Sequence, residues 1–307
     1  MNTNGKLILG TVQLGMDYGI NNKRGKPSRE ESFAILDHAV ESGVRLFDTA
    51  FAYGDAEDIL GEWMSSRGIR DRVSVISKLK PHAVANIAKS DIGHAVEREV
   101  EKSLARLKRE HLDGYLLHTP EYIYNESVLS ALEFCKKNGL VKNIGVSIYE
   151  EADAVYAARS GRVDYIQVPY SVFDQRMDRG DFFAEAKKNG VTVFARSAFL
   201  QGLICMETHE IPEHLREARD YLRTFDTIRA KYALSRIQAA LLFSCEHPGI
   251  DHVVFGVDTP AQLDEDIHIA ETGVMPDACR SELRNHFHDI PKSIIFPSLW
   301  KTNSPKN

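Results

Sequence analysis

Eight short apolar runs, separated by segments with helical periodicity, constrain the fold of this chain more than any other feature. The runs are rich in β-branched residues and cover residues 6–10, 44–50, 73–78, 113–118, 143–147, 164–170, 191–197 and 252–257. Strands joined by helical crossovers run parallel, and parallel strands buried on both faces have near-continuous apolar sequences. Eight such units predict an α/β fold, a closed (β/α)8 TIM barrel.

The segments between these runs predict the helices that surround the barrel. The first, REESFAILDHAVESG, has a cap at Ser28, apolar spacing at Phe33, Leu36 and Val40, and an end at Gly43. Further helices are predicted at 94–107, 125–138, 150–160, 177–189, 214–231 and 259–270. The long interval before the last run holds two helical patterns, so we expect one additional helix between strands seven and eight.

An open, doubly wound sheet is the main alternative fold. Such sheets that bind dinucleotides carry GxGxxG after the first strand, whereas the first run here is followed by GTVQLGMDYGI. No linker rich in Pro, Gly or Ser divides the chain, so residues 1–307 are expected to form a single domain. Its C-terminal tail, residues 276–307, has prolines at 291, 297 and 305 and cannot be one continuous helix. Phe296 and Trp300 in this tail either line a substrate pocket or act as packing anchors.

Composition excludes several classes of protein. The chain is 43% hydrophobic and 27% charged, which is enough apolar material for a large core. Its 38 basic and 44 acidic residues are spread out, with no basic tract to bind nucleic acid. No stretch approaches the roughly 20 apolar residues of a membrane span. We therefore expect a cytoplasmic protein, a monomer or small homo-oligomer, with neither a nucleic acid nor a membrane as partner.

Cysteines and histidines show no metal-binding or disulfide pattern. The four cysteines are far apart and form no CxxC pair, which is typical of reduced thiols: Cys135, Cys205, Cys245 and Cys279. The stretch HEIPEH, residues 209–214, differs from the zinc motif HExxH because its histidines are five apart, with Pro212 between them. We expect no metal site.

Polar residues close three successive apolar runs. The second run ends in Asp48, the third in Lys78 and the fourth in His118, and Tyr53 lies on the loop directly after Asp48. Because reactive side chains of a barrel lie where its strands end, these four residues are expected to converge on one mouth. Taken singly, each has a structural interpretation as a solvated strand end, a packed histidine or a helix cap.

The four residues form a coherent set for proton transfer. A free tyrosine has a pKa of about 10, and we expect the Lys78 ammonium to lower the pKa of Tyr53. A buried lysine keeps its charge only beside a carboxylate such as Asp48, and His118 can hydrogen-bond a substrate oxygen. Such a site protonates a carbonyl oxygen as a hydride reaches its carbon, or works in reverse.

The chain resembles the aldo-keto reductases over nearly its whole length. FDTAFAYGDAEDILGEWM, at 47–64, is similar to the signature D-T-A-x-x-Y-G-x-S-E-x-x-L-G of that family, and VISKL, YLLHTP, IGVS and IQVPY also match. The resemblance implies that Tyr53 is the general acid and base, that Lys78 and Asp48 tune it, and that His118 positions the carbonyl.

The resemblance also implies a nicotinamide dinucleotide, bound across the barrel mouth without a Rossmann motif. Ser147 and Gln167 would hold the nicotinamide carboxamide, and Arg196 stands where relatives have a stacking aromatic. The other positions implied to contact the cofactor are Gly10, Thr11, Asp48, Ser197, Phe199, Gln201, Gly202, Gly256, Asp258, Gln262 and Asp266.

The segment GVDTPAQLDED, residues 256–266, bears on the choice between NAD and NADP. Many relatives that prefer NADPH place Lys or Arg there to pair with the 2'-phosphate, whereas this chain has Gly256, Val257 and Gln262, with Asp258 nearby. A phosphate beside an uncompensated carboxylate is unfavourable. We hypothesise that NAD(H) is used at least as well as NADP(H).

The predicted activity is NAD(P)H-dependent reduction of an aldehyde or ketone, a small-molecule substrate, to an alcohol. The polar loops TPEYIYNE and SVFDQRMDRGD favour a hydroxylated, sugar-like compound. Two alternatives remain: a sugar or alcohol dehydrogenase that works in the oxidative direction, and a nicotinamide-sensing regulatory subunit with little turnover.

Overall fold

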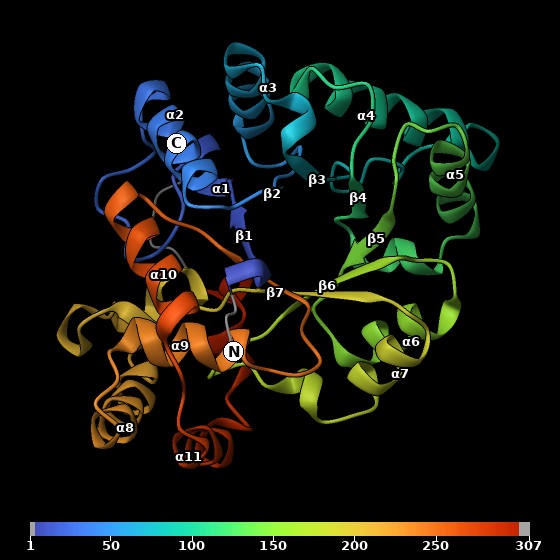
Figure 1. Ribbon diagram of the computed structural model, residues 1–307. Helices are drawn as coiled ribbons and strands as arrows, with labels where there is room; N and C mark the ends of the chain where they lie inside the picture. Colours follow the sequence, from blue (N-terminus) through green and yellow to red (C-terminus); the bar gives the residue numbers. More distant parts are fainter. Residues whose placement is uncertain (1–3, 301–307) are drawn as a thin grey trace.

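The computed structural model describes residues 4–300, and its eight parallel strands close into a barrel (Figure 1). Neighbouring strands pair in order, and β1 pairs with β8, with Leu7 opposite Val253. All eight predicted runs form strands, and the barrel prediction is confirmed. The strands are β1 Leu7–Gly10, β2 Leu46–Asp48, β3 Ser74–Lys78, β4 Gly114–Leu117, β5 Ile144–Ser147, β6 Tyr165–Pro169, β7 Thr192–Arg196 and β8 His252–Phe255.

A ring of helices surrounds the strands in Figure 1. These helices are α2 Arg29–Glu41, α3 Ala56–Arg67, α4 Ile92–Leu107, α5 Glu126–Lys137, α6 Glu151–Ser160, α7 Phe182–Lys188, α9 Arg236–Cys245 and α10 Pro260–Thr272. A short helix, α1 Val12–Gly15, follows β1, and α8 Ala218–Lys231 precedes α9. Since α8 and α9 both lie between β7 and β8, the additional helix predicted there is confirmed.

Helix boundaries depart from the sequence prediction at three places. Helix α3 was not predicted, although its buried residues Ile59, Leu60, Trp63 and Met64 have helical spacing. The helix predicted at 177–189 begins only at Phe182, after a separate 3-10 turn and a glycine, and the one predicted at 214–231 begins at residue 218. By contrast, the cap predicted at residue 28 forms a complete capping box with the side chain of residue 31.

The C-terminal tail consists of short helical pieces separated by prolines, as expected. These are α11 Asp277–Phe287, α12 Lys292–Ile295 and the 3-10 turn Pro297–Leu299. Helix α11, red in Figure 1, packs beside α8. The indole N–H of Trp300 donates to the carbonyl oxygen of Ile294 at 3.0 Å. Trp300 therefore links the end of the tail to α12. The last seven residues of the predicted tail, 301–307, lie outside the described residues.

Two apolar clusters divide the interior. The large cluster fills the space between strands and helices, and a small one of Ile8, Ile76, Leu116 and Phe194 fills the barrel itself. These barrel residues come from β1, β3, β4 and β7. Toward the carboxyl ends of the strands, polar side chains replace apolar ones inside the barrel. Within residues 4–300, no helix is long and apolar enough to span a membrane.

Candidate active site

The candidate site lies at the carboxyl ends of the strands. Asp48, Lys78, Ser147 and Arg196 are the last residues of β2, β3, β5 and β7, and His118 directly follows β4. Because all strands are parallel, these residues share one face of the barrel. This arrangement brings together side chains that are up to about 150 residues apart in sequence.

A buried ion pair forms the floor of the site. The Nζ of Lys78, a fully buried side chain, lies 2.6 Å from Oδ1 of Asp48 and 2.9 Å from the carbonyl oxygen of Thr49. The other oxygen of Asp48 accepts a hydrogen bond from Nε2 of Gln167 at 2.8 Å, and Ser147 Oγ donates to Oε1 of Gln167 at 3.3 Å. Both charges are therefore compensated, as burial of an ion pair requires.

Tyr53 is held by a close approach between two loops. The loop after β2 turns at Gly54, whose φ of 58° lies in the left-handed region. Gly15, at the end of α1, packs so closely on this loop that a Cβ there would collide with the carbonyl oxygen of Tyr53. The Tyr53 ring contacts the His118 ring edge-on, with centroids 5.8 Å apart, and Lys78 Nζ lies 5.0 Å from its centroid.

The pKa of the Tyr53 phenol differs from the sequence-based expectation. Burial raises this pKa above its usual value, the Asp48 carboxylate raises it further, and Arg196 is the cation that lowers it. Lys78 was expected to lower the pKa of Tyr53, but its ammonium group forms an ion pair with Asp48. Tyr53 consequently stays protonated at neutral pH, which suits a proton donor.

His118 is neutral and has an unused hydrogen-bonding atom. Burial, with the charges of Lys78 and Arg196, lowers the pKa of His118 to about 3. Its Nδ1 is buried and has no partner among the described residues. A neutral imidazole carries one N–H donor and one acceptor, so His118 can hydrogen-bond a substrate oxygen without adding a charge.

A cavity of about 690 Å³ opens over these residues. This volume is typical of ligand pockets. Every residue that the resemblance assigned to the cofactor lines the cavity, as do Tyr53 and His118, whereas Lys78 lies behind Asp48 and does not. The lining residues that the sequence reasoning missed are Val12, Gln13, Tyr18, Gly19, Asn21, Asn22, Tyr149, Ala198, Cys205, Ile237, Val254, Phe255, Glu265, Pro297 and Ser298.

Four of the missed residues lie within three residues after the end of a strand: Val12, Gln13, Tyr149 and Ala198. Tyr18, Asn21 and Asn22 lie on the polar loop between α1 and α2. The residues just after the strand ends could have been predicted from the sequence, because they directly follow apolar runs and barrel sites are built from the loops there. Phe296 and Trp300 do not line the cavity, although Pro297 beside them does, and Phe296 stacks on Tyr149 with centroids 5.9 Å apart.

The loop after β7 provides a cradle with an unusual backbone. Ser197, Leu200, Gln201 and Gly202 all have φ between 48° and 88°. Such left-handed residues are uncommon outside glycine and cluster at binding sites, where their N–H groups form concave anion sites. The loop is therefore suited to a phosphate-bearing ligand.

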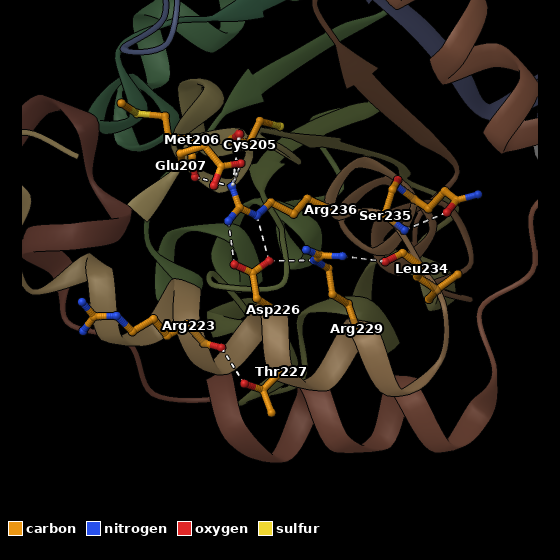
Figure 2. Close-up of polar contacts among 11 residues, drawn as sticks. Cys205, Met206, Glu207, Arg223, Asp226, Thr227, Arg229, Leu234, Ser235 and Arg236 are labelled. Atoms are coloured by element: carbon orange, nitrogen blue, oxygen red, sulfur yellow. Dashed lines mark hydrogen bonds and ion pairs between the residues drawn. The ribbon is translucent and has the colours of Figure 1, made fainter. Parts of the chain in front are cut away.

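This loop is anchored from outside by a charged network (Figure 2). Arg236, the first residue of α9, forms an ion pair with Asp226 of α8 at 2.6 Å. The same guanidinium donates to the carbonyl oxygens of Cys205 and Met206, at the end of the cradle. Arg229 also donates to Asp226, at 2.7 Å, so helices α8 and α9 together hold the loop in place.

The end of the cavity near β8 is acidic. Asp258, Glu265 and Asp266 line it, and Oδ1 of Asp258 is buried without a partner among the described residues. Burial raises the pKa of Asp258, an effect partly offset by Arg24, which itself pairs with Glu31 at 3.1 Å. Burial, and secondarily the charge of Glu265, raises the pKa of Asp266 to about 8.

The raised pKa of Asp266 predicts a pH-dependent stability. The native protein retains a proton that the unfolded chain releases near pH 4, so the free energy of unfolding decreases as pH rises from about 4 to 8. Asp266→Asn should raise the stability of the cofactor-free protein by roughly 2–4 kcal/mol at pH 8 and change it little at pH 4. Urea unfolding at both pH values measures this, with exposed Asp71→Asn as control. Equal effects at both pH values would contradict the assignment.

The fold and the site together define a barrel whose buried lysine–carboxylate pair, protonated tyrosine and neutral histidine lie beside a cavity of about 690 Å³. In the described residues, no group of three or more His, Cys, Asp or Glu side chains is placed to hold a metal ion.

The chain belongs to the aldo/keto reductase family, whose model matches residues 6–286. It is an NAD(P)-dependent oxidoreductase.

Individual relatives are distant but match over most of the chain. It is 26% identical to aldo-keto reductase YhdN of Bacillus subtilis over 263 residues, which cover 78% of each protein. It is 26% identical to the uncharacterized oxidoreductase YqkF of the same organism over 300 residues, covering 92% of this chain and 96% of YqkF. A solved aldo-keto reductase from Bacillus halodurans, in its holo form, has a TM-score of 0.70 at 21% identity and 91% coverage of both chains. That structural likeness supports the fold.

Proposed function

We propose that this protein reduces an aldehyde or ketone to an alcohol, with Tyr53 as the proton donor. The observation that carries the proposal is the convergence of a protonated phenol and a neutral imidazole on one cavity, over the Lys78–Asp48 pair. We further propose that the chain acts as one barrel domain in the cytoplasm, on a small-molecule substrate.

Each catalytic side chain has a defined task in this proposal. His118 donates a hydrogen bond to the carbonyl oxygen and orients it, and Tyr53 gives its phenolic proton to that oxygen as the carbon is reduced. The Lys78 ammonium, 5.0 Å from the ring, stabilises the phenolate that remains, while Asp48 keeps the lysine charged. A bound nicotinamide dinucleotide supplies the hydride.

The residues of the cavity are suited to hold that cofactor. The hydroxyl of Ser147 and the amide of Gln167 lie beside Asp48, where they can bind a carboxamide. The left-handed loop from Ser197 to Gly202 offers N–H groups for a pyrophosphate. Gly256 packs against the amide end of the Gln13 side chain, which would have to move to make room for a Cβ.

The protonated state of Tyr53 suits a proton donor in the reductive direction. Removal of a proton from an alcohol requires a phenolate, and burial together with Asp48 raises the pKa of Tyr53.

The polar loops that prompted the prediction of a sugar-like substrate, after β4 and β6, contribute no residue to the cavity lining among the described residues. Polarity on the substrate side comes instead from His118, Tyr149 and Arg196.

We propose that NAD(H) is used at least as well as NADP(H), because the cavity end near β8 is acidic. We expect kcat/KM with NADH to equal or exceed that with NADPH, since Asp258 would repel a 2'-phosphate. Gln262→Arg, which adds a cation to this end, should raise kcat/KM for NADPH by about 10-fold. Asn285→Arg, which adds the same charge at an exposed position of α11, is the control. A strong preference of the wild-type protein for NADPH would contradict the proposal.

A further inference from the structure

Arg196 is a cation without an anionic partner inside the cavity. Its guanidinium donates to the carbonyl oxygen of Ile148 at 3.3 Å and to Ser197 Oγ at 3.4 Å, and lies 4.4 Å from the Tyr149 ring centroid. All three partners are neutral, and no ion pair to Arg196 occurs within residues 4–300. Asp48 is already engaged by Lys78 and Gln167. The reacting end of the cavity therefore carries one uncompensated positive charge.

The guanidinium reaches toward the end of β5 and toward the tail. Arg196 ends β7, yet it reaches past β6 to the carbonyl of Ile148, which directly follows β5. The neighbouring Tyr149 stacks on Phe296 of the tail, so the charge lies on the side of the cavity covered by the tail. The acidic residues lie near β8, almost across the barrel from β5.

The charge of Arg196 reaches the reacting groups. It contributes, after burial and Lys78, to the lowered pKa of His118, and it is the cation that opposes the rise in the pKa of Tyr53. An anion bound at Arg196 would therefore lie beside the residues that meet the carbonyl. Among the described lining residues, Arg196 is the only lysine or arginine.

We propose that the substrate carries an oxyanion, a carboxylate or a phosphate, which pairs with Arg196 while its carbonyl oxygen meets Tyr53 and His118. This inference rests on the proposed carbonyl reduction. A planar guanidinium binds carboxylates and phosphates in bidentate fashion, and a partly buried, unpaired one gains most from such a partner. The Tyr149 ring holds the guanidinium in place for that contact.

Matched probes test the proposal. 4-Carboxybenzaldehyde and its methyl ester differ in one negative charge, and glyceraldehyde 3-phosphate and glyceraldehyde form the phosphate pair. We expect KM for the charged member of at least one pair to be about 10- to 100-fold lower, the effect of a charge-assisted hydrogen bond. Arg196→Gln should abolish this preference and Arg196→Lys should retain part of it, whereas Arg223→Gln, on the exposed face of α8, should leave it intact (Figure 2). Which pair responds identifies the oxyanion.

Cofactor affinity, measured by quenching of protein fluorescence, distinguishes an Arg196 that pairs with the substrate from one that pairs with the cofactor. Because Arg196 also stands at a position that the resemblance assigns to the cofactor, we expect Arg196→Gln to raise the KM of the charged probe by a larger factor than it raises the Kd of the dinucleotide. If the Kd weakens as much as KM rises, Arg196 pairs with the cofactor phosphates and the inference is wrong. Equal KM values within both probe pairs would also overturn it. If even the neutral aldehydes are not reduced, it is the proposed function that fails.

Discussion

Tyr53→Phe is expected to lower kcat/KM for carbonyl reduction by about 10²- to 10⁴-fold, the usual contribution of a positioned general acid. The substitution removes one oxygen and keeps the ring that contacts His118 at 5.8 Å and Lys78 at 5.0 Å. Cofactor affinity and the free energy of unfolding should therefore change little. Steady-state kinetics, with dinucleotide binding measured on the same preparation, checks the result.

The pH dependence of the wild-type enzyme provides an independent test of Tyr53. Since the pKa of the phenol is raised and that of His118 is lowered to about 3, neither group titrates near neutral pH. The rate of reduction should stay flat across neutral pH and fall only above the ordinary phenol pKa of about 10. Tyr156→Phe, on the exposed face of α6, serves as control and should keep full activity. A Tyr53→Phe variant with more than a tenth of wild-type activity would exclude Tyr53 as the proton donor.

Lys78→Met should have the second large effect, on both stability and activity. The substitution leaves Asp48, 3% exposed, without its charged partner, and loss of one member of a buried pair costs about 3–5 kcal/mol. Activity should fall by orders of magnitude, because the phenolate loses the nearby ammonium. Urea unfolding and kcat measured on the same variant give the two quantities.

The double variant Lys78→Met with Asp48→Asn separates stability from catalysis. Removal of both charges leaves no uncompensated ion, so we expect most of the lost stability to return while activity stays low. Lys136 and Asp164 form a surface pair at the same 2.6 Å separation, and Lys136→Met should cost no more than about 1 kcal/mol. Activity that recovered together with stability in the double variant would show that Lys78 is only structural.

The barrel was predictable because its rules are local. A short apolar run indicates a strand that is buried on both faces. A segment with helical periodicity between two such runs indicates the helix that connects two parallel strands. Each run formed its strand within two residues at either end. Helix α3 was missed, in part because Gly61 interrupts its apolar pattern, and only the packed structure shows that α4 lies too close there for a side chain.

The sequence by itself determined that the polar residues ending β2 and β3 and following β4 meet on one face of the barrel. Parallel strands of similar length must end on one face, so Asp48, Lys78 and His118 converge wherever their strands run side by side. The tertiary structure alone decided what state these groups adopt. Burial raises the pKa of Tyr53 and lowers that of His118, and Arg196 turns toward β5 with no anion to meet it. Such properties depend on solvent exclusion and on contacts between residues remote in sequence, which no local pattern records.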